Sequence, residues 1–512
     1  MGASRRALAR VDAAFNAIYS WRYNPLYYTG QLVIAAFVAL LVTGLYLLLF
    51  YRIGSPYESV ARITEQAWTG RWIRTLHRYA SAAVVVAGTL HAFRYFAQDR
   101  AWGPRALAWI SGIVLFGLFY MCGWTGYVMV WDVQAQLLAA EGARIFDFLP
   151  VFSEPIGRAF VGESPVPAAF FFLNLFAHIA VPVGIALLLW VHLSRLARTY
   201  LMPPRPLLWT LTAAFVAASV IWPVGMAAKA DLLRLPVRTA FDVFYGFWLP
   251  VTRELPAGWV WVGVLSALSL AVAVPWISRP RRQGRLAPAV VNERICTGCD
   301  QCYVDCPYEA ISMVPRRDGR DGRVAVVEDA KCTACGVCSA SCAPMCIGVP
   351  ELGGRDQLAD VREFLRGPGA DTDVVLVACE RGSGGVGRLD RFDGASVLPI
   401  PCSGSLHTSV IEHLVRGGVD GVLVLSCRPG DCWNREGQKW LVERVHHGRL
   451  AELKERVDRR RVRVGHAGAG EVREVRALLA SFRADLGGDH RPAEPSGAPD
   501  LVAATLRRET GS

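Results

Sequence analysis

The sequence predicts a multidomain protein: an α-helical membrane bundle of about six transmembrane helices, followed by a small α+β domain and a parallel α/β domain. Two observations lead to this prediction. The 512-residue chain is dominated by long apolar stretches up to about residue 278, and beyond that it has the composition of a soluble protein. Thirteen of the 14 cysteines lie in the second part, in tight groups. We expect domains at 1–285, 286–350 and 351–485, and a flexible tail at 486–512.

Six apolar stretches form the predicted membrane helices. Each is close to the ~20 residues that cross the hydrocarbon core of a bilayer, and most lack the polar face of a soluble helix. They are 31–51, 79–97, 107–131, 168–193, 207–228 and 257–278. The N-terminal segment has charge but no apolar run of the kind found in a cleavable signal. We therefore expect it to form a surface helix that lies against the membrane.

Arginine-rich loops predict the orientation of these helices. Arginines concentrate at the N-terminus and in alternate loops with few acidic residues, which places those segments in the cytoplasm. Both termini and everything after residue 285 are then cytoplasmic, at the inner membrane of a prokaryote. In that reducing compartment, clustered thiols indicate metal ligation rather than disulfides. Membrane-flanking arginines also account for the net charge of +11, and no nucleic-acid recognition motif accompanies it.

Four histidines of the membrane part form two pairs with the same 14-residue spacing: His77 with His91, and His178 with His192. Fourteen residues are close to four helical turns, so the members of a pair share one helix face about 21 Å apart. A single membrane histidine is often bonded to a neighbouring helix, because an imidazole in hydrocarbon needs a partner. Two matched pairs instead indicate two low-spin haems, each with two axial imidazoles.

The order of the helices predicts how these histidines pair. The second and fourth helices of an up-down bundle run parallel. We therefore expect His77 to face His178 nearer the outer side, and His91 to face His192 nearer the cytoplasm.

Glycines and arginines near the histidines fit the same interpretation. Glycine pairs with a 14-residue spacing on the first and third helices could clear space for two porphyrins, although small residues are also common at ordinary helix contacts. Arginines within one turn of the histidines could pair with haem propionates, although arginines at membrane ends often extend to water. The glycines are Gly30, Gly44, Gly112 and Gly126, and the arginines are Arg74, Arg94, Arg195 and Arg198.

The stretches "WIRTLHRYASAAVVVAGTLHAFRYF" and "WTGYVMVW" resemble cytochrome b of the bc-type respiratory complexes and their photosynthetic relatives, over about residues 15–200. The resemblance implies a bis-histidine bundle with two haems that reacts with quinone. It weakens after residue 200, where the family's second quinone site usually carries Pro-Glu-Trp-Tyr and this chain has "FDVFYGFWLP". Asp242 and Tyr245 in that stretch could accept quinol protons, and an interfacial aromatic belt explains it about as well.

Two cysteine runs have the spacing C-x2-C-x2-C-x3-C, which is typical of two 4Fe–4S clusters. In that arrangement three ligands of each cluster come from one run and the fourth from the other. The first cluster is assigned Cys296, Cys299, Cys302 and Cys342, and the second Cys332, Cys335, Cys338 and Cys306. Zinc is the alternative, and the two interlocked four-cysteine runs disfavour it. The segment 288–350 resembles bacterial two-cluster ferredoxins, except that Ala343 replaces the usual proline, and we expect the spare Cys346 to pack as an ordinary buried residue.

The region after residue 350 alternates apolar β-branched runs with helical patterns, which predicts a parallel α/β sheet. Strands are expected at 373–378, 396–400, 421–426 and 461–465, and helices near 406–417, 433–457 and 470–484. Cys379, Cys402 and Cys427 come just after strand ends, at the edge where open α/β sheets bind their ligands. With the nearby Cys432 they could hold a 2Fe–2S cluster, and four buried free cysteines are the alternative.

The stretch "PCSGSLHTSVIEHLVRGGVDGVLVLSCRPGDCWNREG" resembles the iron–sulfur delta subunit that joins NiFe-hydrogenase to heterodisulfide reductase, over about 372–470. The resemblance implies electron transfer between a flavoprotein partner and another redox module. The family's first strand usually ends in C-x-x-C, and Gly382 stands at the second of these positions here. "GSGGVG" at 382–387 matches G-x-G-x-x-G, but the next strand begins too soon after it for a dinucleotide-binding helix. We interpret it as a glycine-rich loop.

Together these features predict a membrane electron-transfer subunit of a quinone-linked oxidoreductase. Electrons would pass between a cytoplasmic flavoprotein or another redox partner and membrane quinone, through the iron–sulfur clusters and two b haems. The chain would work within a multi-subunit complex that could be dimeric, with the primary substrate site on another subunit. Two alternatives remain: a membrane anchor and electron conduit of a hydrogenase or reductase without its own quinone site, and a redox sensor or assembly scaffold.

Overall fold

A computed structural model describes most of the chain. The described residues are 3–150, 155–160, 162, 165–194, 198–234, 242–278, 287–367, 372–447, 449 and 451–487. They divide into two compact units. The first comprises residues 1–288 with 306–312 and 326–334, and the second comprises 289–305, 313–325 and the chain from 335 onward. Almost all of the tail expected at 486–512 lies outside the described residues.

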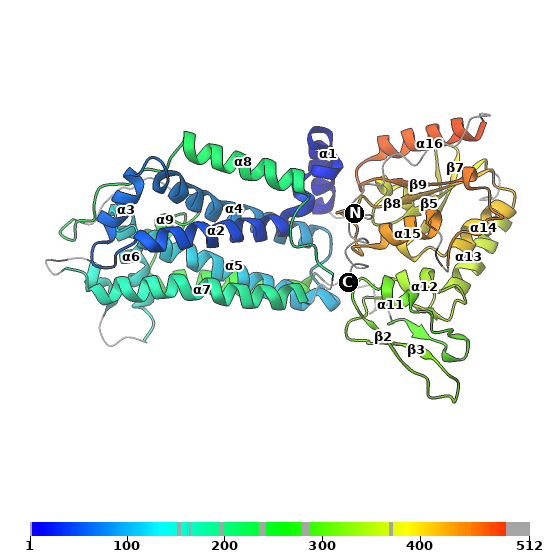
Figure 1. The fold of residues 1–512 in the computed structure, drawn as a ribbon, viewed down its shortest axis with the longest axis horizontal. Helices are drawn as coiled ribbons and strands as arrows, with labels where there is room; N and C mark the ends of the chain where they lie inside the picture. Colours follow the sequence, from blue (N-terminus) through cyan, green and yellow to red (C-terminus); the bar gives the residue numbers. More distant parts are fainter. Residues whose placement is uncertain are drawn as a thin grey trace. The chain divides into compact units, whose positions relative to one another are not determined.

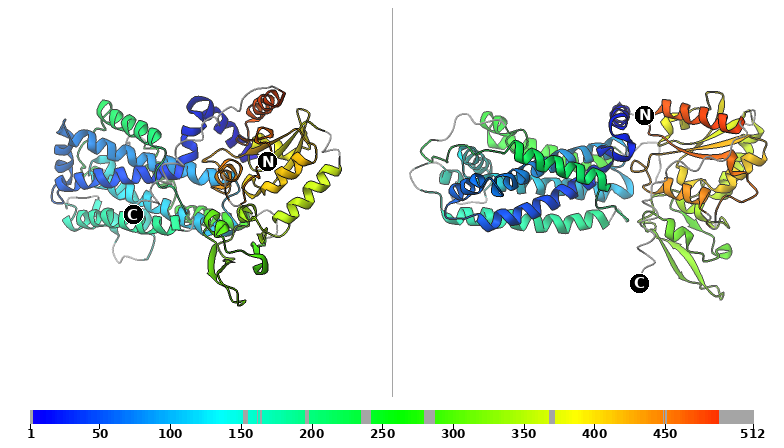
Figure 2. Two further views of the ribbon diagram at one scale, coloured as in Figure 1. Left: turned by 45° about the vertical axis from the view of Figure 1, so that its right-hand side comes forward. Right: turned by 45° about the horizontal axis from the view of Figure 1, so that its top comes forward.

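Five helices of the described chain are long and apolar enough to cross a membrane, and they match five of the six predicted spans. They are α2 (Thr29–Phe50), α4 (Gly70–Ala97), α5 (Ala106–Val128), α7 (Ala168–Ser194) and α10 (Ala257–Ile277). Helices α2, α4, α5 and α7 run side by side in one bundle (Figures 1 and 2).

The sixth predicted span, 207–228, is wrong in its extent. Helix α8 (Arg205–Ile221) has 17 residues, fewer than the other five. It ends before Trp222 because that residue precedes Pro223, and a residue before proline is disfavoured in the helical conformation.

Shorter helices complete the first unit: α1 (Ala3–Tyr23), α3 (Pro56–Glu65), α6 (Val133–Phe146) and α9 (Leu249–Glu254). Helix α1 forms where the surface helix is predicted, and the other three were not predicted. Two hydrogen bonds connect α1 to α4. The buried Arg94 donates to both carboxylate oxygens of the buried Asp12, at 2.7 and 3.1 Å. Such a bidentate ion pair holds one relative orientation of two side chains.

The cysteine-rich region forms two small sheets and two short helices. Strand β1 (Val290–Val291) pairs antiparallel with β4 (Ile347–Gly348), and β2 (Ile311–Pro315) pairs with β3 (Arg323–Val327). The helices are α11 (Gln301–Asp305) and α12 (Val337–Ser341). This agrees with the predicted α+β domain.

The last region is the predicted α/β domain. Its sheet has the strand order β6-β7-β5-β8-β9, with β7, β5, β8 and β9 parallel and the short β6 antiparallel at one edge. The strands are β5 (Val374–Cys379), β6 (Arg391–Phe392), β7 (Ala395–Ile400), β8 (Gly421–Ser426) and β9 (Val462–His466). All four predicted strands are confirmed, and β6 was not predicted.

Four helices cover this sheet: α13 (Gly354–Arg366), α14 (Thr408–Arg416), α15 (Gly437–His446) and α16 (Val472–Gly487). Helix α15 is much shorter than the predicted 433–457, and α13 was not predicted. The segment "GSGGVG" forms 3₁₀ turns (Ser383–Arg388) in which Gly384 and Gly385 have positive φ, as expected of a glycine-rich loop.

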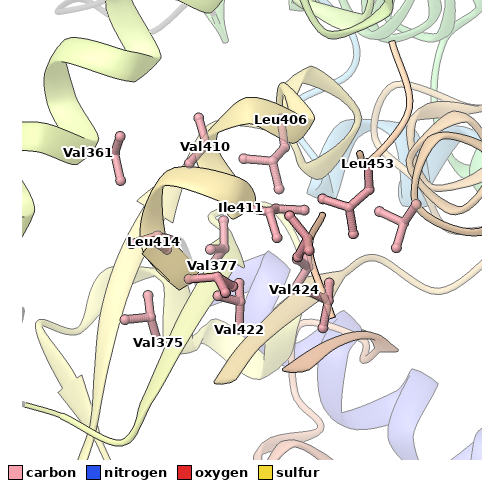
Figure 3. Close-up of a cluster of buried hydrophobic side chains, with 14 of the residues drawn as sticks. Val361, Val375, Val377, Leu406, Val410, Ile411, Leu414, Val422, Val424 and Leu453 are labelled. Atoms are coloured by element: carbon pink, nitrogen blue, oxygen red, sulfur yellow. The ribbon is translucent and has the colours of Figure 1, made fainter. Parts of the chain in front are cut away.

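Both faces of the sheet are buried. Val375 and Val377 of β5 pack in one core with Val361 of α13 and Leu414 of α14 (Figure 3). The alternate residues of β5 pack in a second core with Leu479 of α16. Burial on both sides explains why the strands are almost continuously apolar. Cys379 at the end of β5 and Cys427 directly after β8 both lie at the carboxyl edge of the sheet.

Candidate metal centres

The described structure brings the membrane histidines together in the predicted pairs. The ring centres of His77 on α4 and His178 on α7 are 6.4 Å apart. An imidazole nitrogen binds a metal at about 2.0 Å, and the ring centre lies about 1.2 Å behind it, so two rings on one metal have centres about 6.4 Å apart. His91 on α4 interacts electrostatically with His192 on α7. The separation of the first pair therefore suits one iron between two imidazoles.

Each of the four histidines has a hydroxyl group beside its Nδ1 atom, supplied by an adjacent helix. The Oγ–Nδ1 distances are 2.8 Å for Thr43–His77, 3.3 Å for Thr29–His91, 2.9 Å for Ser111–His192 and 3.1 Å for Thr125–His178. Helix α2 supplies two of these hydroxyls to α4, and α5 supplies the other two to α7. The sequence analysis missed them. The signal was present, because each hydroxyl residue directly precedes one of the four glycines with the 14-residue spacing.

These contacts determine which histidine nitrogen carries the proton. Thr43 donates its hydroxyl proton to the Ala39 carbonyl at 2.6 Å, so its oxygen accepts a hydrogen bond from His77 Nδ1. For His178, the Cys122 carbonyl lies 2.9 Å from Nδ1, and a carbonyl can only accept. With the proton on Nδ1, the Nε2 lone pair is free to bind a metal. The residues present therefore fit axial haem ligation.

The four glycines have a more direct role than the predicted clearance of porphyrins. A Cβ atom added to Gly126 would lie 2.6 Å from His178 Cε1, and one on Gly30 would lie 2.8 Å from His91 Cε1. At Gly44 and Gly112 the same atom would lie 3.3 and 3.4 Å from the ring. The absence of a side chain lets each imidazole reach the neighbouring helix. The clearance of porphyrins stays a prediction.

The arginines expected near haem propionates have protein partners. Arg74 donates to the carbonyls of Val224 and Gly225, and Arg94 pairs with Asp12. Arg198 lies 3.7 Å from Glu309, and Arg195 lies outside the described residues. Their role toward propionates stays a prediction.

Asp242 and Tyr245, expected near quinone, belong to one polar cluster with Arg78 and Ser81 of α4, the helix that also carries His77. Arg78 pairs with the Asp242 carboxylate, which also accepts the backbone N–H groups of Phe244 and Tyr245, both at 2.7 Å. The buried Tyr245 hydroxyl is 2.6 Å from the Ser81 hydroxyl. Sequence reasoning missed Arg78 and Ser81. Only their position, one and four residues beyond His77, could have suggested them.

The thiols assigned to the first 4Fe–4S cluster lie close together in the second compact unit. Burial, followed by electrostatic repulsion from Cys342, Cys299 and Cys296, raises the pKa of Cys302 to about 12. Burial and repulsion thus disfavour the Cys302 thiolate unless a positive charge lies nearby, and iron ions would supply that charge. This donor set fits the predicted cluster.

The thiols assigned to the second cluster are also buried or half-buried. Burial is the largest cause that raises the pKa of Cys306, and repulsion from Cys332 adds to it. Cys335 interacts electrostatically with Cys402 of the α/β domain. Cys335 therefore lies close to the thiol group of that domain.

Four thiols meet at the carboxyl edge of the α/β sheet. The Cys379 and Cys427 sulfurs are 3.7 Å apart, and the Cys427 thiol also hydrogen-bonds Cys432. A Cβ atom on Gly437 would lie 3.1 Å from the Cys402 sulfur and 3.6 Å from the Cys432 sulfur. Burial and repulsion from Cys379 and Cys432 raise the pKa of Cys402 well above its usual value. As in the first set, a cation near these thiols would favour the thiolate form of the Cys402 side chain.

The glycine that departs from the C-x-x-C pattern is also explained. A Cβ atom on Gly382 would lie 2.8 Å from the Cys427 sulfur, so that sulfur occupies the place of a second cysteine side chain. Among the described residues, no group of three or more donors surrounds a single metal ion. This is expected of iron–sulfur clusters, because different thiolates bind different irons of one cluster.

Two buried side chains connect the α/β domain to the 4Fe–4S segment. Arg444 of α15 donates to the Gly404 carbonyl at 2.6 Å and to the Ser341 hydroxyl at 3.1 Å, and lies 3.6 Å from the Asp305 carboxylate. His407 accepts the Ser409 N–H at Nδ1, so its Nε2–H donates to the Cys342 carbonyl at 3.2 Å. Burial lowers the pKa of His407 to about 4, which keeps it neutral. Neither residue was predicted, because the sequence does not reveal which domains touch.

Comparison with known families agrees with this division of the chain. The cytochrome b/b6/petB family matches residues 16–200, the 4Fe–4S dicluster domain matches 295–346, and the methyl-viologen-reducing hydrogenase delta subunit family matches 375–487. The chain joins a cytochrome b/b6 domain to a 4Fe–4S dicluster domain and a hydrogenase delta-subunit-like domain. It therefore holds b-type haem and iron–sulfur clusters, and it is a membrane protein.

One curated relative and one solved structure are similar to part of this chain. The menaquinol:cytochrome c reductase cytochrome b subunit of Geobacillus thermodenitrificans is 27% identical over 167 residues, which are 31% of this chain and 75% of the relative. A solved structure described as a hyperthermophilic respiratory Complex III aligns with 18% identity and a TM-score of 0.41, and covers 52% of this chain and 81% of that chain.

Replacing Thr43 with valine should weaken haem binding at the His77–His178 pair. Valine has the shape of threonine but leaves the Nδ1–H group without an acceptor, and loss of such a partner typically lowers metal-site affinity roughly 10–100-fold. The measurement is the rate at which apomyoglobin extracts haem from the purified protein. Thr89→Val is the control, because the exposed Thr89 hydroxyl bonds only the Val85 carbonyl of its own helix. Equal extraction rates in the two variants would contradict a ligand-orienting role.

Replacing Gly437 with alanine should remove the predicted 2Fe–2S cluster, because the added methyl group would crowd the Cys402 sulfur. Iron content should fall by about the two atoms of such a cluster, while the EPR signals of the 4Fe–4S clusters persist. Gly487→Ala is the control, since nothing lies within 4 Å of a Cβ atom at that position. Unchanged iron content in Gly437→Ala would argue against a cluster at these thiols.

Proposed function

We propose that the chain is the membrane electron-transfer subunit of a quinone-linked oxidoreductase. It passes electrons between a cytoplasmic flavoprotein or other redox partner and membrane quinone, through a 2Fe–2S cluster, two 4Fe–4S clusters and two b haems. The observation that carries the proposal is that one chain combines two histidine pairs suited to metal binding with two groups of adjacent thiols in its second compact unit. The haem and cluster irons supply one-electron chemistry when bound.

The haem ligands and the cluster ligands lie in different parts of the chain. His77, His178, His91 and His192 hold the two haems within the apolar bundle. The hydroxyl groups beside them keep each Nδ1 proton in place, so that Nε2 stays available to iron. The cysteine groups hold the clusters outside the bundle, where Cys335 and Cys402 lie close to each other.

Quinone reacts in this proposal at the polar cluster of Arg78, Asp242, Tyr245 and Ser81. Oxidation of a quinol releases protons together with electrons, so its site needs groups that accept or relay protons. Asp242 and the hydroxyls of Tyr245 and Ser81 offer such groups beside the His77–His178 pair. The similarity to a menaquinol-oxidising cytochrome b subunit supports menaquinol as the first substrate to test.

Orientation, partners and assembly are part of the proposal. The arginine-rich loops support cytoplasmic termini and cytoplasmic iron–sulfur domains at the inner membrane of a prokaryote. The delta-subunit family supports a multi-subunit complex whose primary substrate site lies on a separate redox subunit.

The quinone site is tested by replacing Asp242 with asparagine. Loss of a positioned proton acceptor should slow haem reduction by menaquinol roughly 100-fold or more, because proton transfer typically contributes 10²–10⁴-fold. Haem reduction is monitored by stopped-flow absorbance in purified protein, and the dithionite-reduced spectrum shows that both haems remain. Glu254→Gln is the control, since it neutralises an exposed carboxylate on α9. If Asp242→Asn matches this control, quinone binds elsewhere, and if menaquinol fails to reduce the parent protein, the quinone-linked function is wrong.

A further inference from the structure

The cysteine that falls outside the two four-cysteine runs lies at the first cluster's ligands. Cys346 is buried, and its sulfur is 3.3 Å from the sulfur of Cys342. Its side chain also hydrogen-bonds Cys296. Cys346 therefore contacts two of the four thiols assigned to the first cluster. The expectation that it packs as an ordinary buried residue leaves these two sulfur contacts unexplained.

An internal repeat shows what is unusual about this position. The same turn comes after the last cysteine of each run: Glu309 and Met345 both have positive φ, at 49° and 53°. In each turn the residue four positions after the cysteine donates its backbone N–H to the cysteine sulfur. Ala310 donates to Cys306 at 3.3 Å, and Cys346 donates to Cys342 at 3.2 Å. Residues 310 and 346 are thus equivalent, and the chain has a methyl group at one and a thiol at the other.

We propose that Cys346 is a fifth thiol of the first 4Fe–4S site and can replace Cys342 as the ligand of the same iron. The two sulfurs are already in contact, so a rotation of the Cys346 side chain brings its sulfur to the position that Cys342 leaves. In the exchange, the bond between iron and the Cys342 sulfur breaks and a bond to the Cys346 sulfur forms. The Cys346 thiol proton moves to the Cys342 sulfur, and no electron is gained or lost.

The exchange gives the first cluster a reserve ligand that the second cluster lacks. Three of its ligands, Cys296, Cys299 and Cys302, come from one run and remain bound throughout. Loss or oxidation of Cys342 then leaves a complete set of four thiols, whereas loss of Cys306 leaves the second cluster with three. The inference rests on the assignment of Cys342 to the first cluster within the proposed function, and it does not depend on the reaction with quinone.

The repeat supplies matched variants for the test. Full-length protein is purified without oxygen, and iron and sulfide content is measured together with the EPR spectrum of the dithionite-reduced state. Cys342→Ala should retain both 4Fe–4S clusters, and Cys342→Ala/Cys346→Ala should lose the first one, with about four irons. Cys306→Ala should lose the second cluster, and Cys306→Ala/Ala310→Cys should regain it. Haem absorbance reports that each variant is folded.

The proposal is overturned if Cys342→Ala loses the first cluster as completely as the double variant while haem and the second cluster remain. If Cys342→Ala does not fold, the other arm decides: a thiol introduced at residue 310 that fails to restore the second cluster would contradict the equivalence on which the proposal depends. Failure of menaquinol to reduce the haems would affect neither measurement, so the two proposals fail separately.

Discussion

The hydrogen bonds between four partly buried imidazoles and hydroxyl groups on adjacent helices are the constraint on which the cytochrome b bundle depends. A polar Nδ1–H group inside an apolar bundle is costly unless it is bonded. Each bond requires its hydroxyl at one height along the neighbouring helix, and each adjacent glycine lets the ring approach. The pairs Thr43–His77 and Thr125–His178 therefore relate α2 to α4 and α5 to α7. The same bonds leave the Nε2 atoms free between α4 and α7, where a metal can bind.

In the iron–sulfur part, the constraint is the electrostatic repulsion between closely spaced thiolates. Its thiols are buried so close together that burial and mutual repulsion favour the protonated forms of Cys302 and Cys402. Iron reverses this preference, because metal binding requires the thiolate and supplies positive charge. The buried Arg444 and the neutral His407 meanwhile hold the loop after Cys402 against residues beside the 4Fe–4S ligands. Metal binding and domain packing thus stabilise the same small region.

Features that depend on spacing alone were predicted best from the sequence. The 14-residue interval between histidines and the repeated cysteine runs reflect helix periodicity and cluster geometry, and the structure brings together the histidine pairs and the first cysteine group. Features that depend on tertiary contacts were predicted less well. Helix α8 ends at Ile221, two residues before Pro223. Helix α15 ends at His446, although the sequence pattern predicted a helix that continues to residue 457. The carboxylates that face Arg78 and Arg444 are 164 and 139 residues away in sequence, so no local pattern could reveal them.

The most direct test of the claim that each of the two imidazole pairs binds one haem iron is the number of b haems per polypeptide. Haem is measured by the pyridine haemochrome method in purified full-length protein and in the His77→Leu variant. Two haems are expected in the parent protein, and one is expected in the variant, because the His91–His192 pair lies on the same helices but uses separate ligands. A parent protein with fewer than two haems, or a variant that keeps both, would contradict the assignment of these four histidines.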